Sequence, residues 1–311
     1  MSSQFKPGKN TVEFKSGGDK VAAHLFLPDD YEAGKKYPAT VVTPPVTGVK
    51  EQTGGLYAET LSKKGFAALV FDPRGWGESE GKPGYLIPEW LLRDVRSAVD
   101  FIRTLDVTDT NNVFNTGICM GSGWAMYETA FDTRVNAVAM ISPYLIELDT
   151  PLTLLGAEGY RNLVVKGLTD AAQASFDTGE EVYIKPVPET EEEIKAAPEP
   201  IYVGMRDYYL PGKPGDVPTW KNQVAANSQY SLYGFSIFNY TKLFDPIPIY
   251  LAYGDEAVSN PGAIRFANEV KPEKVTVIEG ADHFDLYWRP EHVEKISNEV
   301  AEFFKGHMQG S

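Results

Sequence analysis

The amino-acid sequence predicts an α/β fold, in which a mostly parallel central sheet is flanked by helices and carries an inserted cap. Short apolar runs that are typical of buried strands alternate with segments whose apolar residues recur at helical spacing. Several of these runs are apolar almost throughout, so both faces of the strand must be covered, as in a parallel sheet between two layers of helices. The alternation stops near residue 144 and resumes near residue 246, which indicates the insertion.

The elements follow in order along the chain. Residues 11–14 and 21–27 alternate between apolar and polar side chains, which predicts an antiparallel strand pair. Buried strands are predicted next at residues 37–43, 66–71, 112–117 and 135–141. Helices are predicted between them at residues 52–64, 88–105 and 125–131, and the second has a proline in its first turn. After the insertion, strands at 247–252 and 274–278 alternate with helices at 261–270 and 290–305.

The length of 311 residues allows a core domain with a substantial insertion. We therefore assign residues 1–143 and 246–308 to the core, and residues 144–245 to the cap. The cap contains an acidic run at residues 189–193, many prolines and many aromatic residues. Most of these aromatic residues are expected to pack in the cap's own core, and the acidic run is expected to be a solvated helix start or loop.

Composition and charge exclude several classes of function. Hydrophobic residues make up 42% of the chain and charged residues 23%, as in an ordinary packed protein. The net charge of −14, from 29 basic and 43 acidic residues, disfavours binding to nucleic acid or to anionic membranes. The first residues lack the apolar stretch of a signal peptide, and no apolar run approaches the ~20 residues that span a bilayer. The single cysteine cannot form an intramolecular disulfide, and we expect a soluble cytoplasmic protein.

The only cysteine lies in the stretch TGICMGSGW, between a predicted strand and a predicted helix. The spacing of Gly117, Cys119 and Gly121 matches the sharp strand-to-helix turn that presents a nucleophile, with cysteine where serine is usual. Side chains at the two glycine positions would collide with the neighbouring strand and helix. The N-terminus of the following helix favours a thiolate. We therefore predict Cys119 as the nucleophile, whereas Ser122, one turn into the helix, is expected to be structural.

The general base is predicted from its position in the chain. Of the four histidines, only His283 follows a late core strand, in the loop EGADHF. His24 lies in the N-terminal strand pair, His292 at the start of the last helix and His307 in the tail. The chain order of nucleophile, acid and histidine, with the histidine after the last strand, favours His283 as the base.

The acid that orients the histidine should follow the strand at residues 247–252. Asp255 is predicted for this role, although many hydrolases place the acid three residues after the glycine of this loop, where this chain has Ala257. Glu256, Asp149 and a plain cysteine–histidine dyad are the alternatives. A thiol needs less activation than a serine hydroxyl, so a missing acid would cost less here.

Two backbone amides are predicted to bind a developing oxyanion. One belongs to Met120, directly after the nucleophile, and the other to the loop after the first buried strand. The two prolines of that loop have no N–H group, so the second donor is Val46 or Thr47. The segment FDPRGWGES is predicted to be a structural turn in which Asp72 and Arg74 pair with nearby backbone.

Three segments, FDPRGWGES, GICMGS and EGADHFDLY, together resemble the α/β-hydrolase superfamily over essentially the whole chain. Within it, VKEQTGGLYAETL, the pair Tyr208 and Tyr209 before a Pro/Gly-rich turn, and GADHFDLYWRPEHV are similar to the dienelactone-hydrolase-related branch. That branch includes uncharacterised bacterial hydrolases and fungal polyketide transferases or hydrolases. Dienelactone hydrolases use a GxCxG cysteine, which Cys119 matches, together with His283 as the base. The resemblance implies an α/β-hydrolase fold, a nucleophile and a base, whereas the long insertion speaks against a small dicarboxylate-like lactone as substrate.

The thiol narrows the predicted chemistry. A thiolate that attacks a simple alkyl ester forms an intermediate from which sulfur, the better leaving group, is expelled again. Thioesters, enol lactones and conjugated carbonyls suit a thiol better. Because the fungal branch acts on polyketide chains that carrier proteins hold as thioesters, we expect Cys119 to form a covalent adduct with a polyketide-type acyl group. Hydrolysis, transfer or carbon–carbon bond formation in secondary metabolism would follow.

Two alternatives of other kinds remain open at this point. One is a general carboxylesterase or lactonase of the dienelactone-hydrolase type. The other is a non-catalytic ligand-binding protein with an α/β-hydrolase fold, for which Ala257 in place of an acid would be a first sign. The expected partner is a small acyl or polyketide substrate, delivered free or on a carrier protein, and no cofactor or metal is expected. The substrate, the acceptor and the oligomeric state are not fixed by the sequence.

Overall fold

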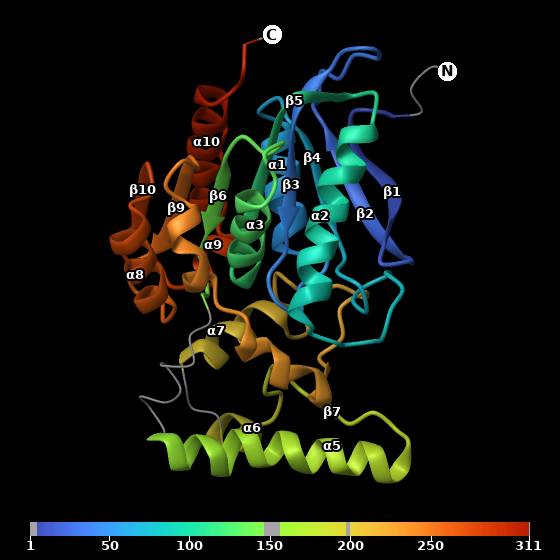
Figure 1. The fold of residues 1–311 in the computed structure, drawn as a ribbon, viewed down its shortest axis with the longest axis vertical. Coiled ribbons are helices and arrows are strands. Elements are labelled where there is room, and N and C mark those ends of the chain that lie inside the picture. The colour runs from blue at the N-terminus through green and yellow to red at the C-terminus, as the bar shows by residue number, and fades with distance from the viewer. Residues whose placement is uncertain (1–4, 146–155, 197–199, 311) are drawn as a thin grey trace.

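A central sheet of eight strands organises the fold (Figure 1). The computed structural model describes residues 5–145, 156–196 and 200–310. In chain order the strands of this sheet are β1 (Gly8–Ser16), β2 (Asp19–Leu27), β3 (Tyr37–Thr43), β4 (Ala67–Phe71), β5 (Thr108–Ile118), β6 (Val138–Ile141), β9 (Ile249–Gly254) and β10 (Lys274–Ile278). Their spatial order is β1-β2-β4-β3-β5-β6-β9-β10. β2 is antiparallel to both neighbours, and the six strands from β4 to β10 are parallel.

The register of the parallel strands brings their carboxyl ends to one edge of the sheet. Thr43 of β3 lies opposite Gly117 of β5, and Ile118 of β5 lies opposite Ile141 of β6. Ile141 in turn lies opposite Ala252 of β9. The loops that leave β3, β5, β6 and β9 therefore emerge side by side, at the edge where open α/β sheets bind ligands.

Helices cover both faces of the sheet, as the sequence predicts (Figure 1). On one face α1 (Thr53–Ser62) packs against α10 (Pro290–Gly306). On the other face lie α2 (Pro88–Thr104), α3 (Met120–Ala130) and α8 (Asn260–Val270). The strand β4 is buried along its whole length because helices lie on both sides of it. The predicted class, a mostly parallel sheet between two helical layers, is confirmed.

The described residues between β6 and β9 form what we call the cap segment. It contains a turn of π-helix (Arg161–Val165), α5 (Lys166–Thr178), β7 (Tyr183–Ile184), α6 (Glu191–Ala196), α7 (Pro200–Tyr209), β8 (Val224–Ala225) and two 3-10 segments (Ala226–Gly234 and Ile237–Leu243). The cap segment lies across the end of the sheet where α3 begins, with α5 outermost (Figure 1). The acidic run forms the exposed start of α6, where Thr190 and Glu193 cap each other's backbone amides.

None of the helices in the described ranges is long and apolar enough to cross a membrane. The longest of them, α2 and α10, each have one apolar face that packs on the sheet and one face that carries charged residues. In α2 the buried residues recur at helical spacing, as Leu91, Val95, Ala98 and Ile102. This pattern is the one from which the sequence predicted the helix.

Candidate active site

Cys119 lies between β5 and α3 in a backbone conformation that few residues adopt. Its φ of 57° and ψ of −125° turn the chain sharply before the first residue of the helix. A Cβ atom on Gly117 would lie 2.4 Å from the carbonyl oxygen of Gly121, and one on Gly121 would lie 2.4 Å from the carbonyl oxygen of Pro44. The predicted reason for the two glycines is therefore confirmed, since no larger residue fits between strand, turn and helix.

Two backbone amides are directed at the sulfur of Cys119. They belong to Met120, the first residue of α3, and to Val46, in the loop after β3. The structure thus brings both predicted oxyanion donors to the thiol. Two N–H groups that converge beside a nucleophile suit an oxygen that gains negative charge there. Thr47, the alternative second donor, follows Val46 and has a left-handed backbone with a φ of 62°.

The loop that carries Val46 is held by a buried lysine. Lys50 is completely buried, and its backbone N–H donates to Asp72 at 2.7 Å. Its ammonium group lies 2.7–2.8 Å from three carboxylates, those of Glu51, Asp72 and Glu78. Burial lowers the pKa of Lys50, but the three carboxylates outweigh burial and hold that pKa above its usual range. We call Lys50 and these three acidic residues the Lys50 cluster.

The turn after β4 is structural, as the sequence predicts. Asp72 accepts hydrogen bonds from the backbone amides of Lys50 and Glu78. Arg74 donates its Nε to Asp94 at 2.6 Å, and both side chains are buried. The two residues predicted to be structural, Asp72 and Arg74, are therefore occupied inside the protein, away from the thiol.

Ser122 lies one turn into α3 and is structural, again as predicted. Its hydroxyl is buried and donates to the backbone carbonyl of Gly117 at 2.9 Å. This bond ties the first turn of α3 back to β5. A hydroxyl committed in this way is not available as a nucleophile.

His283 lies in the loop between β10 and α9 (Asp285–Trp288) and is buried. Its Nδ1 is 2.8 Å from the hydroxyl of Ser259, just before α8, and 3.2 Å from that of Ser142, just after β6. The Ser142 hydroxyl also donates to the backbone carbonyl of His283 at 2.8 Å. Two serines therefore occupy the place where the sequence predicts a carboxylate.

Asp255 is not brought to His283. Its side chain is exposed, and Oδ1 accepts the backbone N–H of Gly280 at 2.7 Å. The physical reason is the path of the loop after β9, in which Asp255 pairs through its backbone with Ile278 at the edge of the sheet. Glu256 is also exposed, and Asp149 lies outside the described residues. In the described part of the chain, no carboxylate is hydrogen-bonded to the imidazole.

Tyr287 connects His283 to Cys119, a contact that the sequence analysis missed. The Tyr287 hydroxyl lies 3.1 Å from Nε2 of His283 and is close enough to the sulfur of Cys119 to lower the pKa of the thiol. The two residues are four apart, so the short helix α9 places the tyrosine one turn after the histidine. That spacing within GADHFDLY was visible in the sequence. Ser259 could have been found by looking two residues beyond Ala257.

The electrostatics of this group differ from those of a charged catalytic pair. Burial raises the pKa of the Cys119 thiol to about 11, although the Tyr287 hydroxyl and the two amides lower it. Burial lowers the pKa of His283 to about 3. At neutral pH the thiol is therefore protonated and the imidazole is neutral.

Residues of the cap segment cover the site. Tyr208 and Tyr209 of α7 are buried, and the ring of Tyr208 packs edge-on against Tyr287 with ring centroids 5.1 Å apart. A small cavity of about 10 Å³ lies beside the first turn of α3; it is lined by Met120, Gly123, Trp124, Tyr144, Leu145, Leu232, Phe235 and Ile237. The thiol side of the site therefore borders an apolar space that the cap segment fills almost completely.

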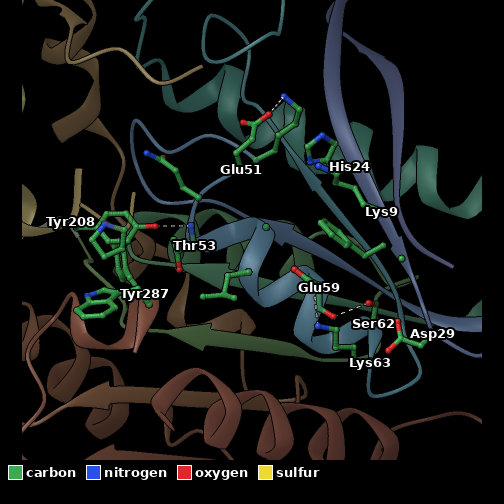
Figure 2. Close-up of a pocket in the computed structure, with 18 residues that line it drawn as sticks. Lys9, His24, Asp29, Glu51, Thr53, Glu59, Ser62, Lys63, Tyr208 and Tyr287 are labelled. Carbon is green, nitrogen blue, oxygen red and sulfur yellow. Dashed lines mark hydrogen bonds and ion pairs between the residues drawn. The ribbon is translucent and has the colours of Figure 1, made fainter. Parts of the chain in front are cut away.

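A more open hollow of about 550 Å³ lies along α1 (Figure 2). Cys119 does not line it, and it meets the site only where Tyr208 and Tyr287 lie together at one end. Its other lining residues are mostly polar and include Lys9, His24 and Glu51. Among the described residues there is no group of three or more histidine, cysteine or acidic side chains placed to hold a metal ion.

Comparison with known proteins agrees with the fold. The family model described as serine aminopeptidase, S33, matches residues 48–178. The chain is 31% identical to the uncharacterized protein PA2218 of Pseudomonas aeruginosa, over 94% of this chain and 78% of that one. The crystal structure of PA2218 superimposes with a TM-score of 0.84 and covers 96% of this chain and 93% of the other.

Two fungal proteins are more distant relatives. The acyltransferase drtE of Aspergillus calidoustus is 24% identical over 96% of this chain and 95% of its own length. The polyketide transferase grgF of a Penicillium species is 23% identical over 89% of this chain and 91% of its own. The crystal structure of GrgF, described as an alpha/beta hydrolase, has a TM-score of 0.78 at 21% identity and covers 96% of this chain and 99% of that one. The chain belongs to the α/β-hydrolase superfamily.

Proposed function

We propose that this protein is a cysteine-dependent enzyme that takes an activated acyl group onto Cys119 and passes it to water or to a second substrate. The observation that carries the proposal is the convergence on one sulfur of two backbone amides and a hydroxyl that leads to a histidine. Each of these groups has a use in acyl transfer. The amides suit an oxyanion, and the histidine suits a proton.

The proposed reaction begins when the sulfur of Cys119 bonds to the carbonyl carbon of the acyl group. The thiol proton passes to His283, and the carbonyl oxygen becomes an oxyanion between the amides of Val46 and Met120. When the carbonyl re-forms, the bond to the leaving group breaks and the leaving group takes the proton. The acyl group on Cys119 then passes to water, to a hetero-nucleophile or to a carbon nucleophile, which gives hydrolysis, transfer or condensation.

Thioesters are the substrates that this site fits best. The thiol is neutral and buried, and the histidine has no carboxylate partner among the described residues, so the site is built for an acyl group that is already activated. A thioester has a leaving group as good as the attacking thiol, whereas an alkyl ester has a poorer one. The acyltransferase and polyketide transferase among the relatives support an acyl or polyketide chain as the cargo. The fit of the cap segment over the thiol favours transfer over hydrolysis, because it limits the access of water.

The proposal is tested by incubating the protein with N-acetylcysteamine thioesters of short, long and aromatic acids. Intact-protein mass spectrometry of acid-quenched samples is expected to show one acyl group on the wild type, and chromatography is expected to show release of the free thiol. Cys119→Ala is expected to lose both. The matched control is Ser122→Ala, because it removes the neighbouring hydroxyl that donates to Gly117 and should leave the adduct in place.

Three outcomes decide between this proposal and its alternatives. Acylation by the thioesters that vanishes only in Cys119→Ala supports it. Turnover of p-nitrophenyl esters at rates that rival the thioesters would instead support a general esterase or lactonase. If the wild type neither acquires an acyl group nor releases a thiol from any of these compounds, the covalent mechanism is wrong and a ligand-binding role is left.

A further inference from the structure

The hydroxyl of Tyr287 lies between the two groups that must exchange a proton. It is 3.1 Å from Nε2 of His283 and close enough to the sulfur of Cys119 to lower the pKa of the thiol. The tyrosine is 1% exposed and its ring packs on Tyr208 and Phe284, at centroid distances of 5.1 Å and 4.9 Å. This packing fixes the position of the hydroxyl between sulfur and imidazole.

Two serine hydroxyls lie on the far side of the imidazole, at Nδ1. Ser142 uses its only hydroxyl hydrogen to donate to the carbonyl of His283, so at Nδ1 the Ser142 oxygen can only accept. We assign the imidazole hydrogen to Nδ1, where the oxygens of Ser259 at 2.8 Å and Ser142 at 3.2 Å can both accept it. In this tautomer Nε2 is unprotonated, and the Tyr287 hydroxyl donates to it. The tyrosine oxygen is left to accept the hydrogen of the Cys119 thiol.

We propose that Tyr287 is a catalytic residue that relays the thiol proton of Cys119 to His283, an inference that rests on the proposed function. As the sulfur bonds to the acyl carbon, the thiol proton moves to the tyrosine oxygen while the tyrosine's own proton moves to Nε2. The tyrosine is neutral before and after, and the imidazole has gained one proton. When the bond to the leaving thiol breaks, both transfers run backwards and the leaving sulfur receives the proton.

Two features of the surroundings fit this relay. Burial raises the pKa of Tyr287 well above its usual range, so the tyrosine does not ionise and must give one proton as it receives the other. Tyr287 also lines the open hollow in Figure 2, so the tyrosine lies at the boundary between that hollow and the thiol.

The test compares Tyr287→Phe with the wild type in single-turnover acylation by a thioester. The variant loses only the hydroxyl, and we expect the acylation rate constant at neutral pH to fall about 100-fold while the half-saturating thioester concentration stays the same. The matched control is Tyr208→Phe, which removes a neighbouring buried hydroxyl that bonds to the amide of Thr53 instead of the thiol. That control is expected to stay close to the wild-type rate.

The pH profile separates a relay from a packing role. In the wild type the relay removes the thiol proton during attack, so the rate should change little between about pH 6 and pH 9. In Tyr287→Phe only the pre-formed thiolate reacts, so the rate should rise about tenfold per pH unit below the pKa of the thiol. Equal rates and parallel profiles for the two proteins would overturn the relay. An equal loss in Tyr208→Phe would overturn it too, because packing would then explain the effect.

A second reagent keeps this inference separate from the proposed function. Alkylation of Cys119 by iodoacetamide requires loss of the same proton and needs no acyl substrate. If thioesters fail to acylate the wild type, the proposed function fails, yet the alkylation profiles of wild type and Tyr287→Phe still decide the relay. Should the variant fail to fold, alkylation of the wild type in mixtures of H₂O and D₂O decides it. A curved dependence on the deuterium fraction means two moving protons and supports the relay, and a straight line contradicts it.

Discussion

Two buried polar groups lie at the carboxyl end of the sheet, and they are built on opposite principles. The Lys50 cluster places one cation against three carboxylates at 2.7–2.8 Å, so every charge in it has a partner. The Cys119 cluster, by which we mean Cys119, Tyr287, His283, Ser259 and Ser142, contains only groups that are neutral at pH 7. Lys50 and Asp72 are completely buried while Glu51 and Glu78 reach the surface, whereas every member of the Cys119 cluster is almost inaccessible to water. The first is held by charge, and the second is held by hydrogen bonds whose protons can move.

The difference shows how the two clusters divide the work of the site. The Lys50 cluster fixes the loop after β3, and with it the amide of Val46, because a buried charged pair is costly to separate. The Cys119 cluster must change its protonation state during a reaction, and a strong ion pair would resist that change. A carboxylate next to His283 would favour an imidazolium before any substrate arrives. Serines hold the ring in the same orientation without adding a charge.

Removing the cation should therefore have the largest effect on stability. Lys50→Met leaves the completely buried carboxylate of Asp72 without its counter-ion, and we expect the free energy of unfolding to fall by about 3–5 kcal/mol. The matched control is Lys63→Met, which breaks a half-exposed pair with Glu59 and should cost no more than about 0.5 kcal/mol. Urea unfolding followed by circular dichroism gives both values. Equal and small losses in the two variants would contradict the structural role assigned to the Lys50 cluster.

Acid should act on the Cys119 cluster through His283. The pKa of this histidine is about 3 in the folded protein because of burial, against an ordinary value of 6.5. Between those values the unfolded state binds more protons, so stability must fall as the pH is lowered, by at most about 1.4 kcal/mol per pH unit. Above pH 6.5 this contribution is complete, and it is lost as the pH approaches 3.

The measurement is urea unfolding of wild type and His283→Gln at several pH values between about 4 and 7. The difference between the two proteins is needed because the pKa of His24 is also lowered, first by burial and then by Lys50, and it adds its own slope. The wild type is expected to lose stability more steeply than the variant as the pH falls. If stability depends on pH in the same way in both proteins, the pKa of His283 is not lowered by burial. The description of the Cys119 cluster as neutral would then be wrong.

The fold and the elbow were predictable because they depend on local patterns. The strand at residues 37–43 was predicted with the bounds that β3 has, since a compact apolar run has few other ways to be buried. The residues predicted as helix at 125–131 continue α3, which begins at Met120, directly after the predicted nucleophile. Cys119 and Met120 were predicted from the turn itself, and Val46 was predicted as the first residue after the two prolines in the loop that follows β3.

The surroundings of His283 were less predictable, because they depend on loops that meet only in three dimensions. Ser142, Ser259 and His283 leave three different strands, and no spacing along the chain links them. Asp255 was predicted from its place after β9, yet in the structure it bonds to the backbone of Gly280. Tyr287 is the exception. It lies one helical turn after His283, so the sequence alone could have indicated that the two side chains are neighbours.

The smallest effect is expected for the serines that replace a carboxylate. Ser259→Ala removes the shorter of the two contacts to Nδ1 and leaves the 3.2 Å contact of Ser142, so the imidazole keeps its orientation in part. A neutral hydrogen bond contributes about 1 kcal/mol net, and we expect the rate of acylation by a thioester to fall about fivefold. Ser62→Ala is the matched control, because its hydroxyl bonds to the carbonyl of Glu59 in α1, away from the site, and its rate should not change. A loss of more than about 1,000-fold in Ser259→Ala would contradict the comparison of the two clusters, because a loss of that size is typical of removing the acid of a catalytic triad. His283 would then depend on Ser259 as the histidine of a triad depends on its acid.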